Sequence, residues 1–209
     1  GTLTKNGSGT LTLSSTSSYG GSTTVNTGKL VFSGSKTGTG RVTVADSAAL
    51  GVTTTGTQVT PDTLTLGSAA GSILEFNSVN STTTAPLAPG TLSSAGTVTI
   101  NINSGAFVTG NSYPLLSWSS GSTPAVNLGF VNGVGGYLTT NGNTIQFNVV
   151  YTTFTWNGTN GGNWTAPNNW LHNGSPATFP GFAPLIPPVQ FDDTAQGTTT
   201  VTVDALVQP

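Results

Sequence analysis

Cysteine and methionine are both missing from this 209-residue chain, and charged residues make up only 5% of it, against roughly 25% in an ordinary soluble domain. Without cysteine, neither disulfides nor thiolate metal sites can hold the fold. Four basic residues and a net charge of -2 cannot neutralise a row of phosphates, so we expect no nucleic-acid partner and no attraction to an anionic membrane. No run approaches the ~18 apolar residues of a membrane helix, so we expect no membrane insertion.

The sequence is filled instead by short runs in which aliphatic residues alternate with Thr, Ser or Asn, from the first residue to about residue 150. This period of two predicts β-strands, and no helical period interrupts it. Several phrases, such as TVNTGKLVF and TLGSAAGSILEF, join two alternating runs through a corner of small residues. Imperfect repeats of roughly twenty residues with this layout predict an all-β solenoid whose units stack on a shared core.

A β-sandwich built from hairpins is the competing interpretation of the same alternation. The Asn-Gly signals that two-residue hairpins need occur mainly at Asn6-Gly7, Asn132-Gly133 and Asn141-Gly142. These are too few to connect all the runs, so we favour the solenoid.

The composition changes from Tyr151 onwards, where three of the four tryptophans, most of the prolines and the only histidine are found. Proline at this density disfavours central strands. We predict a strand at Thr153–Trp156, a long loop, and further strands at Pro188–Phe191 and Thr198–Asp204. The predicted organisation is therefore solenoid turns over residues 1–150, followed by a Trp/Pro-rich loop and strands over 151–209 that continue the same solenoid.

Trp156, Trp164 and Trp170 lie among Asn and Gly in this loop, which permits two interpretations. Aromatic faces flanked by amides can hold sugar rings. A long Pro-rich loop also needs a small core of its own, and we favour this structural role for the three tryptophans. His172, in the same segment, is most simply a loop residue.

Catalytic chemistry has little support in the sequence. Asp192 and Asp193 are adjacent, so on a strand they would point to opposite faces and could not form a carboxylate pair. His172 is the only imidazole, which excludes a zinc site with several histidines in one chain. We expect no enzymatic activity, no cofactor and no metal site, although other β-helical proteins include polysaccharide-degrading enzymes.

The opening stretch GTLTKNGSGTLTLSSTSSYGGSTTVNTGKLVF resembles the autotransporter-associated β-strand repeat, also called the passenger-associated transport repeat, of very large bacterial surface proteins. The matching positions are Leu3, Thr4, Lys5, Gly7, Gly9, Thr10, Leu11, Leu13, Tyr19, Gly20, Gly21, Thr23, Thr24, Val25, Asn26, Gly28 and Leu30. Later segments, including TFTWNGTNGGNWTAPNNW and VQFDDTAQGTTTVTVD, resemble sequences that accompany the repeat. The resemblance implies a right-handed parallel β-helix, an extracellular or cell-surface location reached by a signal outside this sequence, and no catalytic residues.

The chain begins inside a strand pattern and without an initiator methionine, so we expect a processed product or a segment of a longer protein. Neither end carries a recognisable cap, and a solenoid end without a cap exposes unpaired backbone groups. We predict end-to-end assembly strands that carry Leu3, Leu11 and Leu13 at one end and Val201 and Val203 at the other, with the chain itself as the head-to-tail partner.

The predicted function is a structural extracellular solenoid unit that forms a rod, filament or surface sheath, with adhesion to surface glycans as a further option. The alternative is a carbohydrate-binding surface module that uses Trp156, Trp164 and Trp170. Ligand-dependent quenching of tryptophan fluorescence would favour the second of these.

Overall fold

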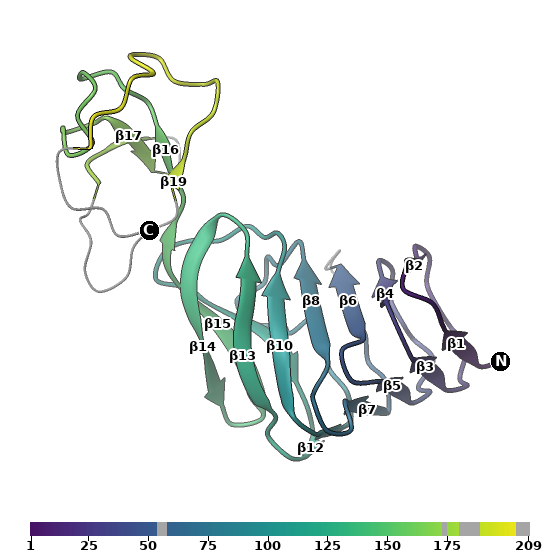
Figure 1. Cartoon of the computed structure of the whole chain (residues 1–209). Helices are drawn as coiled ribbons and strands as arrows, with labels where there is room; N and C mark the ends of the chain where they lie inside the picture. Colours follow the sequence, from purple (N-terminus) through teal and green to yellow (C-terminus); the bar gives the residue numbers. More distant parts are fainter. Residues whose placement is uncertain (54–57, 173–174, 180–188, 204–209) are drawn as a thin grey trace. The chain divides into compact units, whose positions relative to one another are not determined.

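The computed structural model describes residues 1–53, 58–172, 175–179 and 189–203 (Figure 1). The chain divides into two compact units. The first contains Gly1–Phe107, Asn111–Asn132 and Tyr137–Asn148, and the second contains Val108–Gly110, Gly133–Gly136 and Val149–Pro209. The boundary that we predict at residue 150 stays a prediction. No helix in the described ranges is long and apolar enough to cross a bilayer.

Two parallel six-stranded sheets build the first unit. Sheet A consists, in order, of β1 (Leu3–Lys5), β3 (Thr23–Val25), β5 (Val42–Val44), β7 (Thr63–Leu66), β9 (Thr91–Ser94) and β12 (Ser120–Gly121). Sheet B consists of β2 (Thr10–Leu13), β4 (Lys29–Phe32), β6 (Ala49–Thr53), β8 (Ile73–Asn77), β10 (Thr97–Ile102) and β13 (Ala125–Val131). From β1 to β10 the chain alternates between the two sheets, which confirms the predicted all-β solenoid (Figure 1).

The register stacks like residues into columns that run through the solenoid. One column of sheet B contains Leu11, Leu30, Leu50, Leu74, Ile100 and Leu128. Its four inner members are all 0% exposed, because alternate side chains of each strand point into the stack. The first steps of the column, 11 to 30 and 30 to 50, agree with the predicted repeat of roughly twenty residues. The last step, 100 to 128, is longer.

A third side of the solenoid is formed by single bridges between successive turns. Parallel bridges connect Ser17, Lys36, Val59, Leu87 and Leu116 in sequence. Leu116 belongs to β11 (Ser112–Ser117), and β11 pairs antiparallel with β15 (Thr144–Thr152) in a three-stranded sheet completed by β14 (Val134–Asn141). β14 and β15 are therefore not further turns, although they lie largely within the range predicted as solenoid. Asn141-Gly142, one of the hairpin signals in the sequence, lies where β14 ends and the chain turns toward β15.

The second unit contains a mixed four-stranded sheet in the order β18 (Ser175–Ala177), β17 (Trp170–His172), β16 (Phe154–Trp156) and β19 (Val189–Gln190). β17 pairs antiparallel with both β16 and β18, and β16 pairs parallel with β19. β16 confirms the predicted strand near Thr153, and β19 lies inside the predicted strand 188–191, of which Pro188 is outside the described residues. β17 and β18 correct the prediction of an uninterrupted loop. Pro176 is tolerated because β18 is an edge strand.

The predicted strand at Thr198–Asp204 is wrong for its described part. Residues 198–203 run beside residues 158–163, and only one bridge forms, between Asn163 and Thr202. The neighbouring segment cannot be a regular strand, since Gly158 and Gly161 both have positive φ angles. Alternation of Thr and Val is thus not sufficient to form a strand where the neighbouring segment is a turn-rich loop. Asp204 lies outside the described residues.

Candidate assembly face at the N-terminal turn

Residues 1–19 form the end layer of the solenoid, which we call the N-terminal turn. β1 is the first strand of sheet A, and β2 stands at the matching end of sheet B (Figure 1). Each of these two strands has one neighbouring strand, β3 and β4 respectively. Within the described residues, no strand pairs with the other side of either one.

The aliphatic residues of this layer are only partly buried. Leu3, Leu11 and Leu13 all keep some exposure to solvent. Their neighbours in the second turn, such as Leu30 and Phe32, are 0% exposed. The chemical pattern is the same in both turns, so the difference arises because the N-terminal turn has a stacked layer on one side only.

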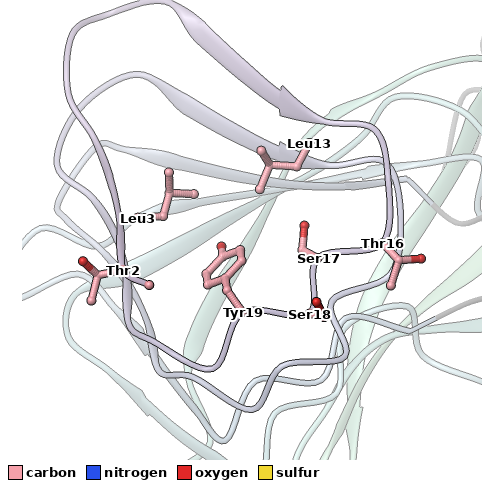
Figure 2. Close-up of a pocket in the computed structure, with 8 residues that line it drawn as sticks. Thr2, Leu3, Leu13, Thr16, Ser17, Ser18 and Tyr19 are labelled. Atoms are coloured by element: carbon pink, nitrogen blue, oxygen red, sulfur yellow. The ribbon is translucent and has the colours of Figure 1, made fainter.

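The partly buried side chains line a cavity of about 470 Å³ in the end of the solenoid. Its lining consists of Gly1, Thr2, Leu3, Leu13, Thr16, Ser17, Ser18 and Tyr19. Figure 2 shows Leu3, Leu13 and Tyr19 directed into the space enclosed by the turn, each from a different side. The Tyr19 hydroxyl is 2.8 Å from Thr23 Oγ1, which ties this ring to the second turn.

The open edges carry backbone groups directed away from the stack. In a parallel ladder, alternate residues of a strand bond to a given neighbour. Leu3 N donates to Ser22 O and Lys5 O accepts from Asn26 N, both at 2.9 Å, so the N–H and C=O of Thr4 face the other way. In β2, the Gly9 and Leu13 carbonyls accept from the second turn, which leaves Thr10 and Thr12 facing outward. These groups are a template for another strand.

Lys5, the only charged side chain of the N-terminal turn, does not protect this edge. Its ammonium group donates to the carbonyl oxygens of Asn6, Gly7 and Thr27 at 3.1, 2.6 and 3.1 Å, and the residue is 7% exposed. A lysine that blunts an edge strand has to project from it into solvent. Lys5 instead fastens the first turn to the second, and the end face remains neutral.

Lys36 makes the reciprocal connection from the second turn. It is 0% exposed, and its Nζ contacts the carbonyl oxygens of Tyr19 (3.5 Å) and Gly38. The same Nζ lies 4.9 Å from the centre of the Tyr19 ring, a cation–π geometry. Burial lowers the pKa of Lys36, because desolvation disfavours the charged form. The two lysines thus link the turns in opposite directions.

The N-terminal turn matches a known family of sequence repeats. Residues 3–32 match the model of the Passenger-associated-transport-repeat, as the opening motif predicts. The chain carries a passenger-associated transport repeat. Such repeats occur in autotransporter passengers, which are exported to the cell surface. No curated protein and no solved structure matches the chain.

The passenger-associated transport repeat corresponds to β1 through β4, which is the N-terminal turn and the part of the second turn that covers it. Gly28, in this repeat, shows how closely the two turns approach. Its φ is +69°, and a Cβ at this position would lie 2.5 Å from the carbonyl oxygens of Gly7 and Gly9. Only glycine satisfies both conditions, so the corner glycine of the repeat is a requirement of stacking.

The opposite end of the solenoid differs from the repeat end. β12, the last strand of sheet A, has two residues. β13 contains a bulge: Ile100 pairs with Leu128 but Ile102 pairs with Val131, and Asn101 Oδ1 accepts from the Phe130 amide at 2.9 Å. The third side passes into the antiparallel pair of β11 and β15. Bulges and short strands are recognised ways of ending a sheet.

Val201 and Val203, the residues predicted for assembly at this other end, lie in the second unit. Val201 packs against the aromatic cluster of that unit, and Val203 is 50% exposed. Neither belongs to a strand. The structure therefore brings Leu3, Leu11 and Leu13 together at one face and does not provide a matching strand at Val201 and Val203.

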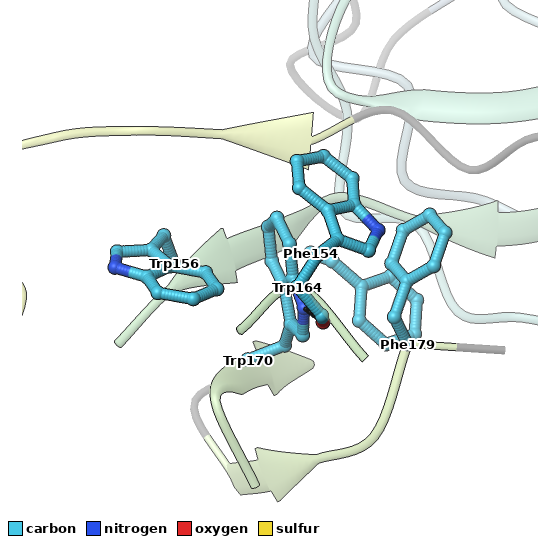
Figure 3. Packing of buried hydrophobic residues seen from close by; sticks show 5 residues of the cluster. All are labelled: Phe154, Trp156, Trp164, Trp170 and Phe179. Atoms are coloured by element: carbon cyan, nitrogen blue, oxygen red, sulfur yellow. Dashed lines mark hydrogen bonds between the residues drawn. The ribbon is translucent and has the colours of Figure 1, made fainter. Parts of the chain in front are cut away.

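Trp156, Trp164 and Trp170 form the centre of a buried cluster with Phe154 and Phe179 (Figure 3). The three indoles are 2%, 7% and 0% exposed, and the ring centres of Trp164 and Trp170 are 4.6 Å apart in an edge-to-face arrangement. Trp170 Nε1 donates to Trp164 O at 2.9 Å, and Trp156 Nε1 donates to Thr198 O at 2.8 Å. Rings covered in this way pack as the core of the loop.

Asn169 organises the same loop and was not identified from the sequence. It is 0% exposed, its amide nitrogen donates to Gly161 O and Asn163 O, both at 2.9 Å, and its Oδ1 accepts from Asn160 N at 2.7 Å. Its position between proline and tryptophan in PNNW gives no signal that separates it from Asn168. Only the fold shows which of the two amides enters the core.

Asp46 and His172 have structural partners. Asp46 Oδ1 accepts from the backbone amides of four consecutive residues, Ser68 to Gly71, at 2.9 to 3.2 Å. These bonds and that from the Ser68 hydroxyl hold the pKa of Asp46 far below its ordinary value. His172 stacks on Phe154 with ring centres 4.5 Å apart. The described residues contain no group of three or more acid, histidine or cysteine side chains placed to hold a metal.

Proposed function

We propose that this chain is a structural solenoid segment of an exported surface protein, and that it joins end to end through its N-terminal turn. The observation that carries the proposal is the contrast between Leu11, which keeps part of its surface exposed, and Leu30, its fully buried neighbour in the same column. A stacked layer on the open side would bury Leu11 as the second turn buries Leu30. The proposed location is supported by the family of the matched repeat.

Two kinds of interaction would stabilise such a layer: burial of apolar side chains and hydrogen bonds between backbone groups. Burying the remaining surface of a leucine contributes up to ~2 kcal/mol, at about 25 cal/mol for each Å² of apolar area. Three leucines share the face, and the outward N–H and C=O groups of β1 and β2 add directional bonds. Association also costs rigid-body freedom, which is of order 4–15 kcal/mol. We therefore expect an association that depends on concentration.

The outer wall of the solenoid suits a mechanical role outside the cell. In sheet A the outward positions of successive strands are stacked hydroxyls: Thr4, Thr24, Thr43, Thr65 and Ser93. Ser93 Oγ lies 3.1 Å from Thr65 Oγ1, so neighbouring turns also bond through this ladder. A neutral wall with four basic residues in the whole chain gives trypsin-like proteases few sites. Passenger repeats are typically non-catalytic, and we propose a non-enzymatic role here.

Light scattering over a wide range of protein concentration tests the proposal, with electron microscopy of the same samples to show the shape. The mass should rise with concentration. A Thr12→Lys variant places a charge on the exposed, outward side of β2 and should lower association at least tenfold. Thr43→Lys, the same change on an inner strand of sheet A, is the control and should leave association unchanged. A chain that stays monomeric at every concentration contradicts the proposed function.

A further inference from the structure

Asparagine followed by glycine is a place where a protein chain can modify itself without an enzyme. The backbone nitrogen of the glycine can attack the side-chain carbonyl carbon of the asparagine, because glycine has no side chain to obstruct the approach. The described residues contain five such pairs, which begin at Asn6, Asn132, Asn141, Asn157 and Asn160. The reaction needs the two atoms in a particular orientation, so the surroundings of each asparagine decide where it takes place.

Two of these asparagines are held by contacts between successive turns of the solenoid. Asn6 Oδ1 accepts from Asn26 Nδ2 at 2.8 Å. Asn132 is held at two points, since its backbone nitrogen donates to Ile102 O at 2.9 Å and its Nδ2 donates to Asn103 O at 3.1 Å. A side-chain amide fixed in this way is not free to turn its carbonyl carbon toward the nitrogen of the next residue.

The two asparagines of the second unit are held within their own loop. Asn157 is 5% exposed, and its Nδ2 donates to Thr159 Oγ1 at 3.1 Å. The attacking atom of this pair is also engaged, because Gly158 N donates to a backbone carbonyl oxygen at 3.2 Å. Asn160 Nδ2 donates to Pro167 O at 2.7 Å. Both pairs are therefore protected by the fold.

Asn141 differs from the other four asparagines. It is the last residue of β14, at the turn that leads to β15, and it is exposed. Within the described residues, its side-chain amide makes no hydrogen bond. Gly142, which follows it, has a φ of +56°, and no atom beyond its chain neighbours lies within 4 Å of a Cβ placed there. The side chain of Asn141 is thus free to turn, and the space around the glycine is open.

We propose that Asn141 deamidates spontaneously, which makes the turn between β14 and β15 a site of covalent modification. Gly142 N attacks Asn141 Cγ, a bond forms between these two atoms, and the bond from Cγ to Nδ2 breaks. The proton of Gly142 N passes through water to the departing Nδ2, which leaves as ammonia. Water then opens the resulting succinimide ring, at the side-chain carbonyl to give aspartate or at the main-chain carbonyl to give isoaspartate. No atom is oxidised or reduced.

Either product changes the turn. Both place a carboxylate where the asparagine was neutral, in a chain whose formal net charge is already -2. Isoaspartate also adds a carbon atom to the main chain, and hairpin geometry depends on the length of the turn. The turn borders the core of the first unit, because Trp118 N donates to Asn143 O at 3.0 Å and Trp118 is 5% exposed.

Incubation of the folded, unaltered chain at mildly alkaline pH tests the proposal, since the attacking nitrogen has to lose its proton. Proteolytic peptides taken at intervals are analysed by mass spectrometry, and fragmentation assigns each amide-to-acid conversion to one asparagine. Conversion at Asn141 should be about tenfold faster or more than at the other four asparagines, because only its side chain is free to adopt the reactive orientation. Isoaspartate should accompany aspartate, because the ring opens in both directions.

Two controls show whether the fold causes the difference. In concentrated urea the five rates should approach one another, because only the sequence neighbours remain. In the folded Asn26→Ala variant, which lacks the donor to Asn6 Oδ1, conversion at Asn6 should speed up while conversion at Asn141 is unchanged. Similar rates at all five asparagines of the folded chain, a difference that persists in urea, or aspartate without isoaspartate would each overturn the proposal. The main comparison uses the unaltered chain, so a variant that fails to fold does not affect it.

Discussion

Truncating Leu11 and Leu30 to alanine, one variant at a time, measures how much less the N-terminal turn is covered than the second turn. Leu11 and Leu30 are stacked partners, and the strands around them have the same alternation. Leu30 is 0% exposed, so Leu30→Ala should cost about 3 kcal/mol, within the range of 2–5 kcal/mol for buried leucines. Leu11 has a stacked neighbour on one side only, and Leu11→Ala should cost about half as much.

Urea unfolding at a concentration low enough to keep the chain monomeric gives both values. With a slope of about 2 kcal/mol per molar urea, the midpoints should fall by about 1.5 M for Leu30→Ala and by about 0.7 M for Leu11→Ala. Because solenoids can unfold from their ends, amide exchange of β1 to β4 should be followed in the same samples. Leu11→Ala should speed exchange in the N-terminal turn alone.

Raising the protein concentration provides the internal control for this comparison. If chains join end to end as proposed, Leu11 gains its second neighbour, so the cost of Leu11→Ala should rise toward that of Leu30→Ala, while the cost of Leu30→Ala stays constant. Equal costs for the two variants in the monomer would refute the reasoning, since they would mean that the first turn is no less covered than the second.

The buried polar groups and the aromatic cluster give further predictions. Because the folded-state pKa of Asp46 is lowered, its stabilising effect is fully present above its unfolded-state pKa near 4 and declines as the pH falls from there through the folded-state pKa, so Asp46→Asn should lower the urea midpoint by more at pH 7 than at pH 2, and an equal effect at both would contradict this. The pKa of Lys36 is lowered by burial, so the unfolded chain binds more protons at alkaline pH; the unfolding free energy should rise toward pH 10.5 relative to that of Lys36→Met, and parallel pH profiles for the two proteins would contradict this. Trp170→Ala should cost the second unit about 4 kcal/mol and abolish its near-ultraviolet circular dichroism, whereas an unchanged fluorescence-detected midpoint would show that the cluster is not a core.

The solenoid could be predicted because the signals that specify each turn are local in the sequence and recur from one turn to the next. Alternation sets which residues of TLTL or KLVF face inward, and the corner glycines set where the chain turns. The prediction failed for strands whose partners are distant in the sequence or are not evident from it. The pair β17 and β18 was missed because of the prolines around it, although the sequence Asn-Gly stands between the two strands. Proline has no N–H group to donate to a sheet, and Pro176 is tolerated because β18 is an edge strand. Which strands are edges is known only once the sheet is assembled.

The candidate face could be predicted only in outline. The leucines of the first turn could be identified from the alternation in TLTL. The sequence does not show where Lys5 directs its ammonium group, because the acceptor at Thr27 arrives with the next turn. In the structure Lys5 is an internal connection between the first two turns. The same applies to Lys36, whose partner at Tyr19 is seventeen residues earlier.

The lengths of the turns explain why the two ends of the solenoid differ. In sheet A, the paired positions advance from Leu3 to Thr23 and from Thr23 to Val42, but later from Thr63 to Thr91. Stacked turns of equal length keep every side in register, and the family match at residues 3–32 covers this regular part. Longer turns place extra residues at the corners. After the last turn, β15 pairs antiparallel with β11, and this pairing ends the parallel ladder on the third side. The solenoid therefore differs along its length, with regular turns in the matched repeat and an antiparallel sheet beside the last turns.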